Sequence, residues 1–385
     1  MEVDDSKRND VVEIMRENLR ELSHIERKEH RTKVLNKNRV ALGNIVPVSF
    51  LTTKFVVEKA KVLKKKPLSI EEYKQLQNAL IQSEEHVNSF LKVDNILHAL
   101  VRDFSSNDPA LQLSAISCCC NIALGNVKAC TSLTKSIAPY LITELDSLNY
   151  PLLDVCVWTL GNLVAGSDKA FEILHAQDCF KYIVSLMSNC DDTIFPSVAY
   201  TAMHYTHVGF QRIPENKMIE LAKAITGRNL SFEDPYFVWL LALLSSQIVC
   251  NIYLHSVVPS IVDYLYQNST NNVANVTEVT ACIRILANTI CETSGDLAKL
   301  FMENPKYTRS DLETLLNKLL SCQYIHVRKE TLWLIGNYKY FIVKLVDQLC
   351  RSNEKNEYLL QAIFTITIVP MLKRLYKTSY RGYRP

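Results

Sequence analysis

Apolar residues recur along this chain with the period of an α-helix. Stretches such as LLDVCVWTLGNLV (residues 152–164) and MIELAKAITGRNL (residues 218–230) place hydrophobic side chains three and four positions apart, which is the pattern of a helix with one buried face. Alternation with period two, which would indicate strands, is not sustained anywhere in the sequence. The pattern therefore predicts an all-α protein.

A tryptophan and an asparagine four residues apart occur twice within these helical patterns, as Trp158 with Asn162 and as Trp333 with Asn337. Residues at i and i+4 lie on the same helix face. Aligning the chain on the asparagines finds further pairs at the same offset, and the second members recur every 39 to 49 residues. The six pairs are Ser117 with Asn121, Trp158 with Asn162, Tyr200 with His204, Trp239 with Leu243, Arg284 with Asn288, and Trp333 with Asn337.

This spacing is typical of armadillo and HEAT repeats, which have about 40 to 47 residues in two or three helices. Because one such repeat cannot bury its own apolar face, several stack into a continuous core with an extended concave surface. We therefore expect an armadillo-repeat, right-handed superhelical solenoid of about seven repeats. Gly125 and Gly166 each follow a pair by four residues, where we expect helices to end with a left-handed glycine cap.

Two interpretations of the paired residues remain open at this stage. A tryptophan on an apolar helix usually belongs to the core. Recurrence at a fixed period instead favours a row of side chains along one face of the stack.

Composition agrees with stacked helices and gives no sign of catalysis. Hydrophobic residues make up 48% of the chain, with only 9 glycines and 12 prolines, which excludes a disordered chain. None of the 12 cysteines forms a C-x-x-C pair, and the 9 histidines are dispersed, so we predict neither a metal site nor a cofactor. Phosphate-binding loops, nucleophile elbows and recognisable catalytic carboxylates are also missing from the sequence. We predict that the protein is not an enzyme.

The sequence also argues against membrane insertion. Two apolar stretches, residues 236–253 and 359–372, are interrupted by polar residues, and the second has only 14 residues, whereas a spanning helix needs about 20. The opening MEVDDSKRNDVVEIM is polar, so we expect no signal peptide. We predict no membrane contact and a location in the cytoplasm and nucleus.

Residues 1–66 differ in character from the repeats and are predicted to form a separate, basic N-terminal helical arm, with the repeat domain at residues 67–385. Between Arg16 and Arg39 there are eight Lys or Arg against four Glu, whereas the net charge of the whole chain is only +3. Such an arm can be a solvated helix, a nucleic-acid or lipid contact, or a ligand for an acidic partner. No aromatic residue lies in this stretch, so we expect no direct nucleic-acid binding by base stacking.

Three segments carry a resemblance to a known family. The segments CVWTLGNLVAGS, CIRILANTI and VRKETLWLIGN, in this order, are similar to repeats of importin-α, the adaptor of nuclear import, and to divergent importin-α-related transmembrane and coiled-coil domain-containing proteins. IERKEHRTKVLNKNRV, residues 25–40, resembles a degenerate form of the segment by which that family binds importin-β. The resemblance implies that an importin-β-like receptor would contact Arg27, Lys28, Arg31, Lys33, Lys37 and Arg39.

The resemblance also implies that the ladder of paired residues binds basic cargo peptides. In that family the asparagines bind the peptide backbone and the indoles receive the stems of lysine side chains, a geometry that cation–π attraction favours. The peptide-binding residues implied here are Asn121, Trp158, Asn162, Tyr200, His204 and Trp239 for an early site, and Arg284, Asn288, Trp333 and Asn337 for a late site.

The early site departs from the family pattern, because Ser117 replaces a tryptophan, Tyr200 and His204 replace a whole pair, and Leu243 offers no hydrogen bond. We therefore expect any binding of basic peptides to be weak and to favour the late site. Two hypotheses remain: a nuclear-import adaptor for basic localisation signals, or a non-transport armadillo scaffold that binds another peptide or protein.

Overall fold

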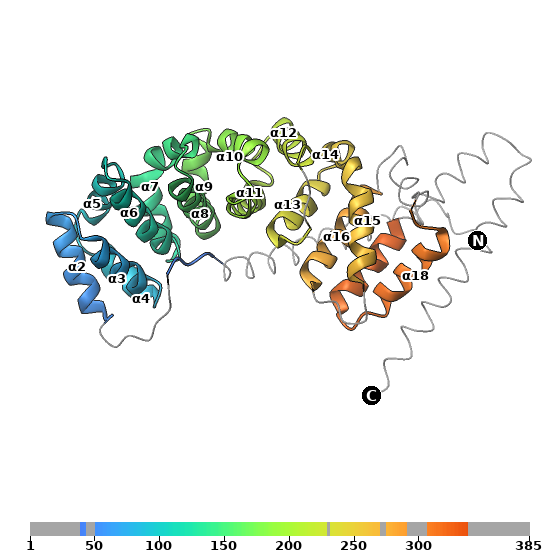
Figure 1. The fold of residues 1–385 in the computed structure, drawn as a ribbon, viewed down its shortest axis with the longest axis horizontal. Helices are drawn as coiled ribbons and strands as arrows, with labels where there is room; N and C mark the ends of the chain where they lie inside the picture. Colours follow the sequence, from blue (N-terminus) through green and yellow to red (C-terminus); the bar gives the residue numbers. More distant parts are fainter. Residues whose placement is uncertain (1–38, 44–50, 229–231, 270–274, 291–305, 338–385) are drawn as a thin grey trace, which may run out of the picture. The chain divides into compact units, whose positions relative to one another are not determined.

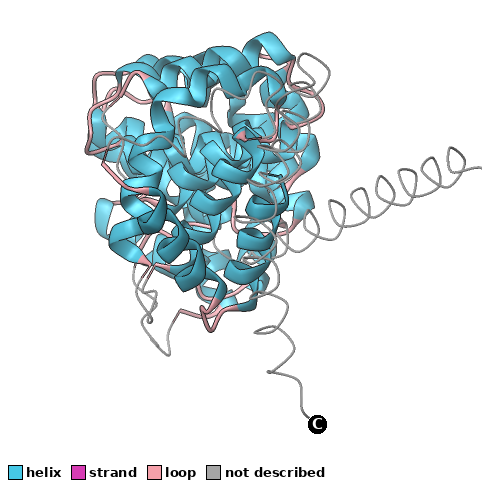
Figure 2. Ribbon diagram, turned by 90° about the vertical axis from the view of Figure 1, so that its right-hand side faces the viewer, coloured by secondary structure: helices cyan, strands magenta, loops and turns pink. Residues whose placement is uncertain are grey.

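A computed structural model describes residues 39–43, 51–228, 232–269, 275–290 and 306–337. The ordered elements in these ranges are helices joined by loops and turns, and none of the described residues forms a strand (Figures 1 and 2). The all-α prediction is confirmed. The basic arm up to residue 38 lies outside the described residues.

Successive helices are short to medium in length and separated by brief loops. Residues 325–337 are also helical. The bounds of the other elements, in chain order, are α2 (Thr53–Lys65), α3 (Ile70–Leu80), α4 (Glu84–Leu91), α5 (Ile96–Phe104), α6 (Pro109–Ile122), α7 (Val127–Thr143), η1 (Glu144–Asp146), α8 (Tyr150–Gly166), α9 (Asp168–His175), α10 (Cys179–Asn189), α11 (Phe195–Gly209), α12 (Glu215–Thr226), α13 (Pro235–Ser245), α14 (Ile248–Asn251), η2 (Ile252–Val257), α15 (Val258–Asn268), α16 (Val276–Thr289) and α18 (Arg309–Leu320).

Local sequence explains where many of these helices begin. The Asp108 carboxylate accepts hydrogen bonds from the first backbone N–H groups of α6, and Pro109 takes the first helical position, where its missing N–H costs nothing. Asp234 with Pro235 starts α13 in the same way. Ser69 forms a reciprocal capping box with Glu72 at the start of α3. Such caps satisfy N–H groups that have no partner inside the helix.

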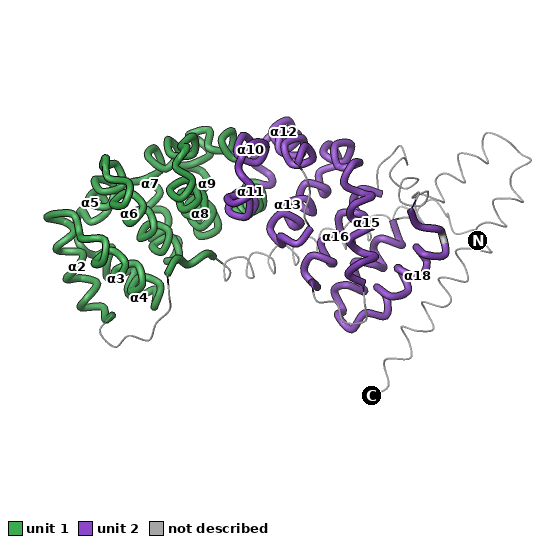
Figure 3. The backbone as a smooth tube through the Cα atoms, viewed as in Figure 1, with its two compact units in different colours: residues 1–183, 200–209 green, residues 184–199, 210–385 purple. Residues whose placement is uncertain are grey.

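The chain divides into two compact units (Figure 3). Unit 1 comprises residues 1–183 and 200–209, and unit 2 comprises residues 184–199 and 210–385. In unit 1, α6 packs against α3 on one side and α8 on the other, so the helices that carry successive ladder residues are neighbours. In unit 2, α13 and α16 are paired in the same way.

The packed part of unit 1 begins before the boundary predicted at residue 66. Helix α2 packs against α3, α4 and α5, because Val56, Ala60 and Leu63 form one apolar stripe that is fully buried. The predicted arm therefore includes α2, which packs with the following helices.

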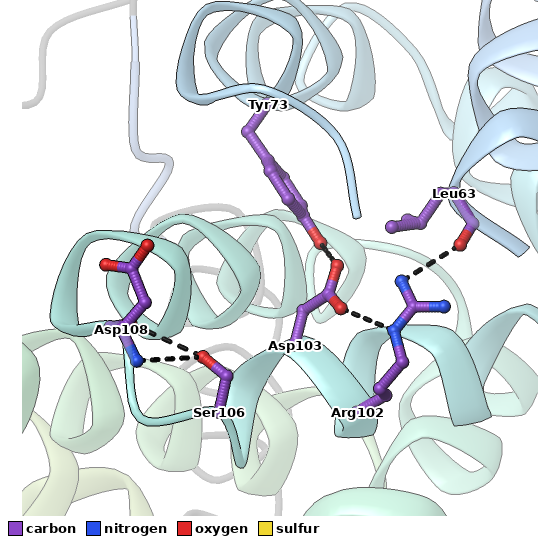
Figure 4. Close-up of polar contacts among 6 residues, drawn as sticks. All are labelled: Leu63, Tyr73, Arg102, Asp103, Ser106 and Asp108. Atoms are coloured by element: carbon purple, nitrogen blue, oxygen red, sulfur yellow. Dashed lines mark hydrogen bonds and ion pairs between the residues drawn. The ribbon is translucent and has the colours of Figure 1, made fainter. Parts of the chain in front are cut away.

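A buried polar cluster ties α2, α3 and α5 together (Figure 4). Asp103 is 1% exposed. Its carboxylate accepts a hydrogen bond from the Tyr73 hydroxyl at 2.6 Å and another from Arg102 Nε at 2.6 Å. Arg102 also donates to the Leu63 carbonyl near the end of α2, at 3.1 Å. The buried charge is thus paired and hydrogen-bonded, as burial requires.

Repeats of three helical pieces are clearest in unit 2, where α14 continuing into η2, then α15, then α16 follow one another. Helix α15 packs on both η2 and α16. The ladder residue lies on the last helix of each repeat. This order of helices, at the period found in the sequence, is that of an armadillo-type α-solenoid.

One apolar segment in the described part of the chain is long enough to cross a membrane by length and composition alone. It is Ile248–Asn268, with half of its most apolar window buried in the protein. Residues 236–253 do not form one helix, because α13 ends at Ser245. Residues 359–372 lie outside the described residues. The absence of membrane contact stays a prediction.

Candidate functional site

Residues 39–43 lie against the ladder helices of unit 1, and the two predicted asparagines bind their backbone. Asn162 Oδ1 accepts a hydrogen bond from Val40 N at 3.0 Å, and Asn162 Nδ2 donates to Val40 O at 2.7 Å. Asn121 repeats this arrangement with Leu42, at 2.9 and 2.7 Å. Each carboxamide therefore binds both polar groups of one backbone residue, and it recognises no side chain by doing so.

The spacing of the two asparagines matches the repeat of an extended chain. Residues 40 and 42 are paired, so one residue is skipped between neighbouring helices. Two residues of extended chain span about 7 Å, comparable with the 8–10 Å between packed helices. The segment runs from α8 to α6, opposite to the order of the helices along the chain.

Both carboxamides are held in place by the protein itself. Asn162 Nδ2 also donates to Cys120 O at 3.3 Å, and Asn121 Nδ2 donates to Gln77 O at 3.0 Å. In each case the acceptor is the backbone carbonyl of a residue that directly precedes an asparagine one repeat earlier, Asn121 or Asn78. Asn162 Oδ1 receives a further bond from the Tyr200 hydroxyl at 2.7 Å. These bonds fix which end of each carboxamide accepts and which donates.

The same geometry identifies a ladder residue that the sequence comparison missed. Gln77 precedes Asn78 on α3, and Asn78 lies 43 positions before Asn121, within the repeat spacing. A Cβ on Gly43 would lie 2.4 Å from Asn78 Oδ1, so the segment reaches Asn78 after passing Asn121. Lys74 stands four residues earlier, and the distance of 43 residues to Asn121 is the signal that could have found Asn78. We call Asn78, Asn121 and Asn162 the asparagine row.

The Arg39 side chain binds at the C-terminal end of α6. Its Nη1 donates to the carbonyl oxygens of Ala123 at 2.7 Å and Gly125 at 3.0 Å, and contacts Cys130 Sγ at 3.7 Å. Carbonyls at a helix C-terminus carry partial negative charge and favour cations. Burial raises the pKa of the Cys130 thiol, and the nearby Arg39 guanidinium offsets part of this rise. We call these two carbonyls and Cys130 the arginine site.

The glycines near the ladder serve close packing rather than left-handed caps. Among the described glycines only Gly43 has a positive φ, so the left-handed caps predicted at Gly125 and Gly166 are wrong. A Cβ on Gly166 would lie 2.5 Å from Cys130 Sγ and 2.7 Å from Arg39 Nη1, and one on Gly125 would lie 2.9 Å from Val87 and Ala129. Gly166 therefore makes room for the arginine site.

Trp158, Tyr200 and His204 form an aromatic group beside Asn162. The Trp158 and Tyr200 ring centroids are 4.7 Å apart, and those of Tyr200 and His204 are 4.4 Å apart. Trp158 is half-buried, whereas Tyr200 is completely buried. A Cβ on Gly161 would lie 2.5 Å from the Tyr200 ring, so Gly161 allows the tyrosine its close approach. The buried Tyr200 therefore contacts Asn162 through its hydroxyl and offers no ring face to a ligand.

His204 is 1% exposed, and its Nε2 has no hydrogen-bond partner among the described residues. Burial lowers the pKa of His204 to about 3, with smaller contributions from His207 and Arg39. The imidazole is therefore neutral at physiological pH. It stands at the ladder position after Asn162.

In unit 2, Arg284 of the predicted late site contacts Trp239, which was assigned to the early site. The Arg284 guanidinium lies 5.1 Å from the Trp239 ring centroid and forms an ion pair with Glu330, whose side chain is 6% exposed. Arg284 itself therefore occupies the Trp239 face that the resemblance assigned to a ligand cation. Glu330 was not predicted, although it lies three residues before Trp333 on the same helix.

The other unit 2 positions keep part of the ladder geometry. Asn337 Nδ2 donates to Ala287 O at 2.8 Å, which again is the residue before the preceding ladder position. Asn288 Nδ2 instead donates to Ser245 Oγ at 3.0 Å, and Ser245 Oγ donates to Ala242 O, the residue before Leu243, at 2.9 Å. Trp333 is 37% exposed. Among the described residues, segment 39–43 lies on the early-site asparagines, and the preference of basic peptides for the late site stays a prediction.

Of the predicted arm residues only Arg39 can be placed. Arg27, Lys28, Arg31, Lys33 and Lys37 lie outside the described residues. Within the described ranges, no group of three or more His, Cys, Asp or Glu side chains could hold a metal ion.

No protein-family profile matches the chain. An engineered protein of the Northeast Structural Genomics Consortium resembles it over 74% of this chain and 68% of its own, with a TM-score of 0.60 and 17% identity. A designed armadillo repeat protein in complex with peptide (KR)4 aligns over 74% of this chain and 99% of its own, but with a TM-score of 0.39 and 15% identity. The first likeness concerns the fold alone, and the second is too weak to support a conclusion.

The repeat order, the period and the row of ladder residues together define an armadillo-type helical-repeat protein. The site on unit 1 consists of carboxamide groups and helix-terminal carbonyls that hydrogen-bond the backbone of residues 40 and 42 and the Arg39 side chain.

Proposed function

We propose that the asparagine row is a peptide-binding site and that residues 39–43 are its intramolecular ligand. The observation that carries the proposal is the double hydrogen bond of each of two asparagines to alternate backbone residues. Such recognition suits any extended segment, because every residue except proline offers the same N–H and C=O groups. A partner protein that supplies a better segment would displace residues 39–43.

The resemblance to importin-α supports a more specific form of this proposal. In it, the protein acts as an adaptor that binds basic localisation signals on the asparagine row and an importin-β-like receptor through residues 25–40. Arg39 supports the link between the two activities, because it belongs to the basic arm and also fills the arginine site. This form places the protein in the cytoplasm and nucleus.

A non-transport scaffold is the second candidate, and the bound segment itself favours it. Only Arg39 among residues 39–43 is charged, and Val40 and Leu42 stand at the two asparagine-paired positions. A site adapted to runs of lysine would not select such a segment. The ion pair of the late-site residue Arg284 with Glu330 supports the same view.

The peptide-binding proposal is tested with the full chain carrying Val40→Pro and Leu42→Pro, which removes both N–H donors of the segment and so frees the row. A fluorescent peptide of residues 36–46 is titrated against it. We expect saturable binding that Asn121→Ala with Asn162→Ala weakens about tenfold or more, since four hydrogen bonds are lost at about 0.5–1.5 kcal/mol each.

Asn288→Ala with Asn337→Ala in unit 2 is the matched control and should leave the affinity unchanged. Equal losses from both pairs, or no binding at all, would overturn the proposal. The adaptor form is tested separately by capture of an importin-β on the full chain. If Arg27→Glu with Lys28→Glu leaves capture unchanged, or no capture occurs, the scaffold is the better description.

A further inference from the structure

We infer that the asparagine row selects a segment with one arginine, two aliphatic residues and a glycine, in the order Arg-aliphatic-any-aliphatic-Gly, rather than a run of lysines. This inference rests on the proposed function and specifies the ligand of that site. It comes from the chemistry of Arg39, Val40, Leu42 and Gly43, the residues that the site holds.

The first requirement is an arginine one residue before the segment residue that Asn162 binds. The contacts described for the Arg39 side chain with Ala123 O, Gly125 O and Cys130 Sγ come from its terminal nitrogen Nη1. This nitrogen lies one bond further from the backbone than the ammonium nitrogen of lysine. A lysine on the same backbone would therefore fall short of both carbonyls. The guanidinium group also presents its N–H donors in a fixed plane, which suits two acceptors at fixed positions.

The room for this side chain comes from Gly166. A Cβ there would lie 2.7 Å from Arg39 Nη1 and 2.5 Å from Cys130 Sγ. A side chain at this position, and an acidic one in particular, would fill the space that the guanidinium occupies. The site is therefore shaped around a long, flat cation and uses uncharged acceptors at the end of α6, where the helix dipole favours positive charge.

The second requirement is a glycine after the residue that Asn121 binds. Gly43 has a φ of +114°, a backbone conformation that glycine adopts readily and other residues rarely adopt. A Cβ at this position would also lie 2.4 Å from Asn78 Oδ1. The backbone conformation therefore selects glycine here, and a larger residue would also have to displace the Asn78 carboxamide.

The three positions between the arginine and the glycine differ in solvent exposure. Val40 and Leu42 are half-buried, whereas Ala41 is exposed. Aliphatic side chains at the two paired positions remove apolar surface from water. The exposed middle position accepts any side chain. A lysine run would place charges at the two half-buried positions, where burial disfavours them.

The test uses the full chain with Val40→Pro and Leu42→Pro as receptor and four peptides of residues 36–46. These are the native peptide and its Arg39→Lys, Gly43→Ala and Ala41→Lys variants, compared by fluorescence anisotropy. We expect Arg39→Lys and Gly43→Ala each to weaken binding about tenfold. The affinity of the Ala41→Lys peptide should stay within about twofold of the native affinity, although this is the only variant that adds a positive charge.

The outcomes separate the two proposals. If the native and Arg39→Lys peptides bind equally well, or if Ala41→Lys binds better than the native peptide, charge alone drives binding and the inference is wrong. If the native peptide does not bind, the peptide-binding function itself falls. The measurement is repeated with an Arg39→Asp chain as receptor, so that a folding defect of the proline variant cannot decide the result.

Discussion

The carboxamide of Asn162 can serve a peptide backbone in only one orientation, and Tyr200 helps to set it. A carboxamide has an accepting end and a donating end. The Tyr200 hydroxyl donates to Oδ1, and Cys120 O accepts from Nδ2. Oδ1 is thereby left facing the Val40 N–H. The tyrosine, which looked from the sequence like the loss of a ligand-binding tryptophan, has gained a positioning role.

Tyr200→Phe tests this role. The variant keeps the ring contacts with Trp158 and His204 but loses the hydroxyl, so we expect about 0.5–1.5 kcal/mol weaker peptide binding and little change in melting temperature. Tyr205→Phe is the matched control: it is equally buried on the same helix, and its hydroxyl bonds His175 at 3.2 Å, away from Asn162. Similar affinity losses in both variants would contradict a specific effect on Asn162.

His204 should make the fold less stable in acid. Burial lowers the pKa of His204 from 6.5 to about 3, so between these values the unfolded chain binds a proton that the folded chain does not. Stability therefore rises with pH in this window and is lost as pH falls below 6.5. Relative to pH 7, the upper limit of the loss at pH 5 is about 2 kcal/mol.

The measurement is denaturant unfolding of the wild type and of His204→Gln at both pH values. Because glutamine does not titrate, the variant should lack this part of the pH dependence, and all other groups cancel in the comparison. Parallel pH profiles for the two proteins would show that His204 is not buried in its neutral form.

At the scale of helices, the sequence predicts the repeat stack well because the period survives in residues of different chemistry. The ladder position holds Asn121, Asn162 and Asn288, but also a histidine and a leucine, and all fall on helices. The contacts were harder to predict. Asn78 lacks an aromatic partner residue, and Glu330 pairs with Arg284 from 46 positions away. A pattern search along the chain cannot find pairs that only helix packing brings together.

In unit 1, Asp103 on α5 accepts a hydrogen bond from Tyr73 on α3 and one from Arg102, which in turn donates to Leu63 O on α2 (Figure 4). Asp103→Ala would leave the buried Tyr73 hydroxyl without an acceptor and Arg102 without its carboxylate. We expect a loss of about 3 kcal/mol in unfolding free energy. Asp108→Ala, a short distance along the chain, removes an exposed helix cap and should cost about 1 kcal/mol.

Denaturant unfolding of the two aspartate variants gives the comparison directly. Adding Tyr73→Phe to Asp103→Ala should recover part of the loss, since the orphaned hydroxyl is then gone. Equal costs for the two aspartates would mean that the buried cluster adds nothing beyond a surface cap.

At the scale of the whole chain, the residues that the resemblance assigns to peptide binding make different contacts at the two ladder sites. The late site keeps more of the expected residues, yet Arg284 forms an ion pair with Glu330 there. The early site has Ser117 and Tyr200 in place of tryptophans but keeps Trp158 and the two asparagines that bind the backbone of residues 39–43. Hydrogen bonds to a backbone need only the carboxamides and the groups that orient them, so this geometry does not require a tryptophan at every ladder pair.

Because the ligand segment belongs to the same chain, it should compete with any peptide added from outside. A tethered segment has an effective concentration on the order of 1 mM. If its intrinsic Kd is on the order of 10 µM, the wild type should bind an added peptide about 100-fold more weakly than a chain whose segment cannot bind. Val40→Pro with Leu42→Pro provides that chain, since neither residue can then donate its N–H.

Ala41→Pro is the matched control, because Ala41 is exposed between the two paired residues and a proline there favours an extended conformation at Val40. We expect anisotropy titrations with the residue 36–46 peptide to show weak binding for the wild type and for Ala41→Pro, and tight binding for the double variant alone. Equal affinities in all three proteins would mean that residues 39–43 do not hold the row in solution. Tight binding by Ala41→Pro as well would mean that any proline in the segment releases it, and that the two asparagine-paired N–H groups are not what retains it.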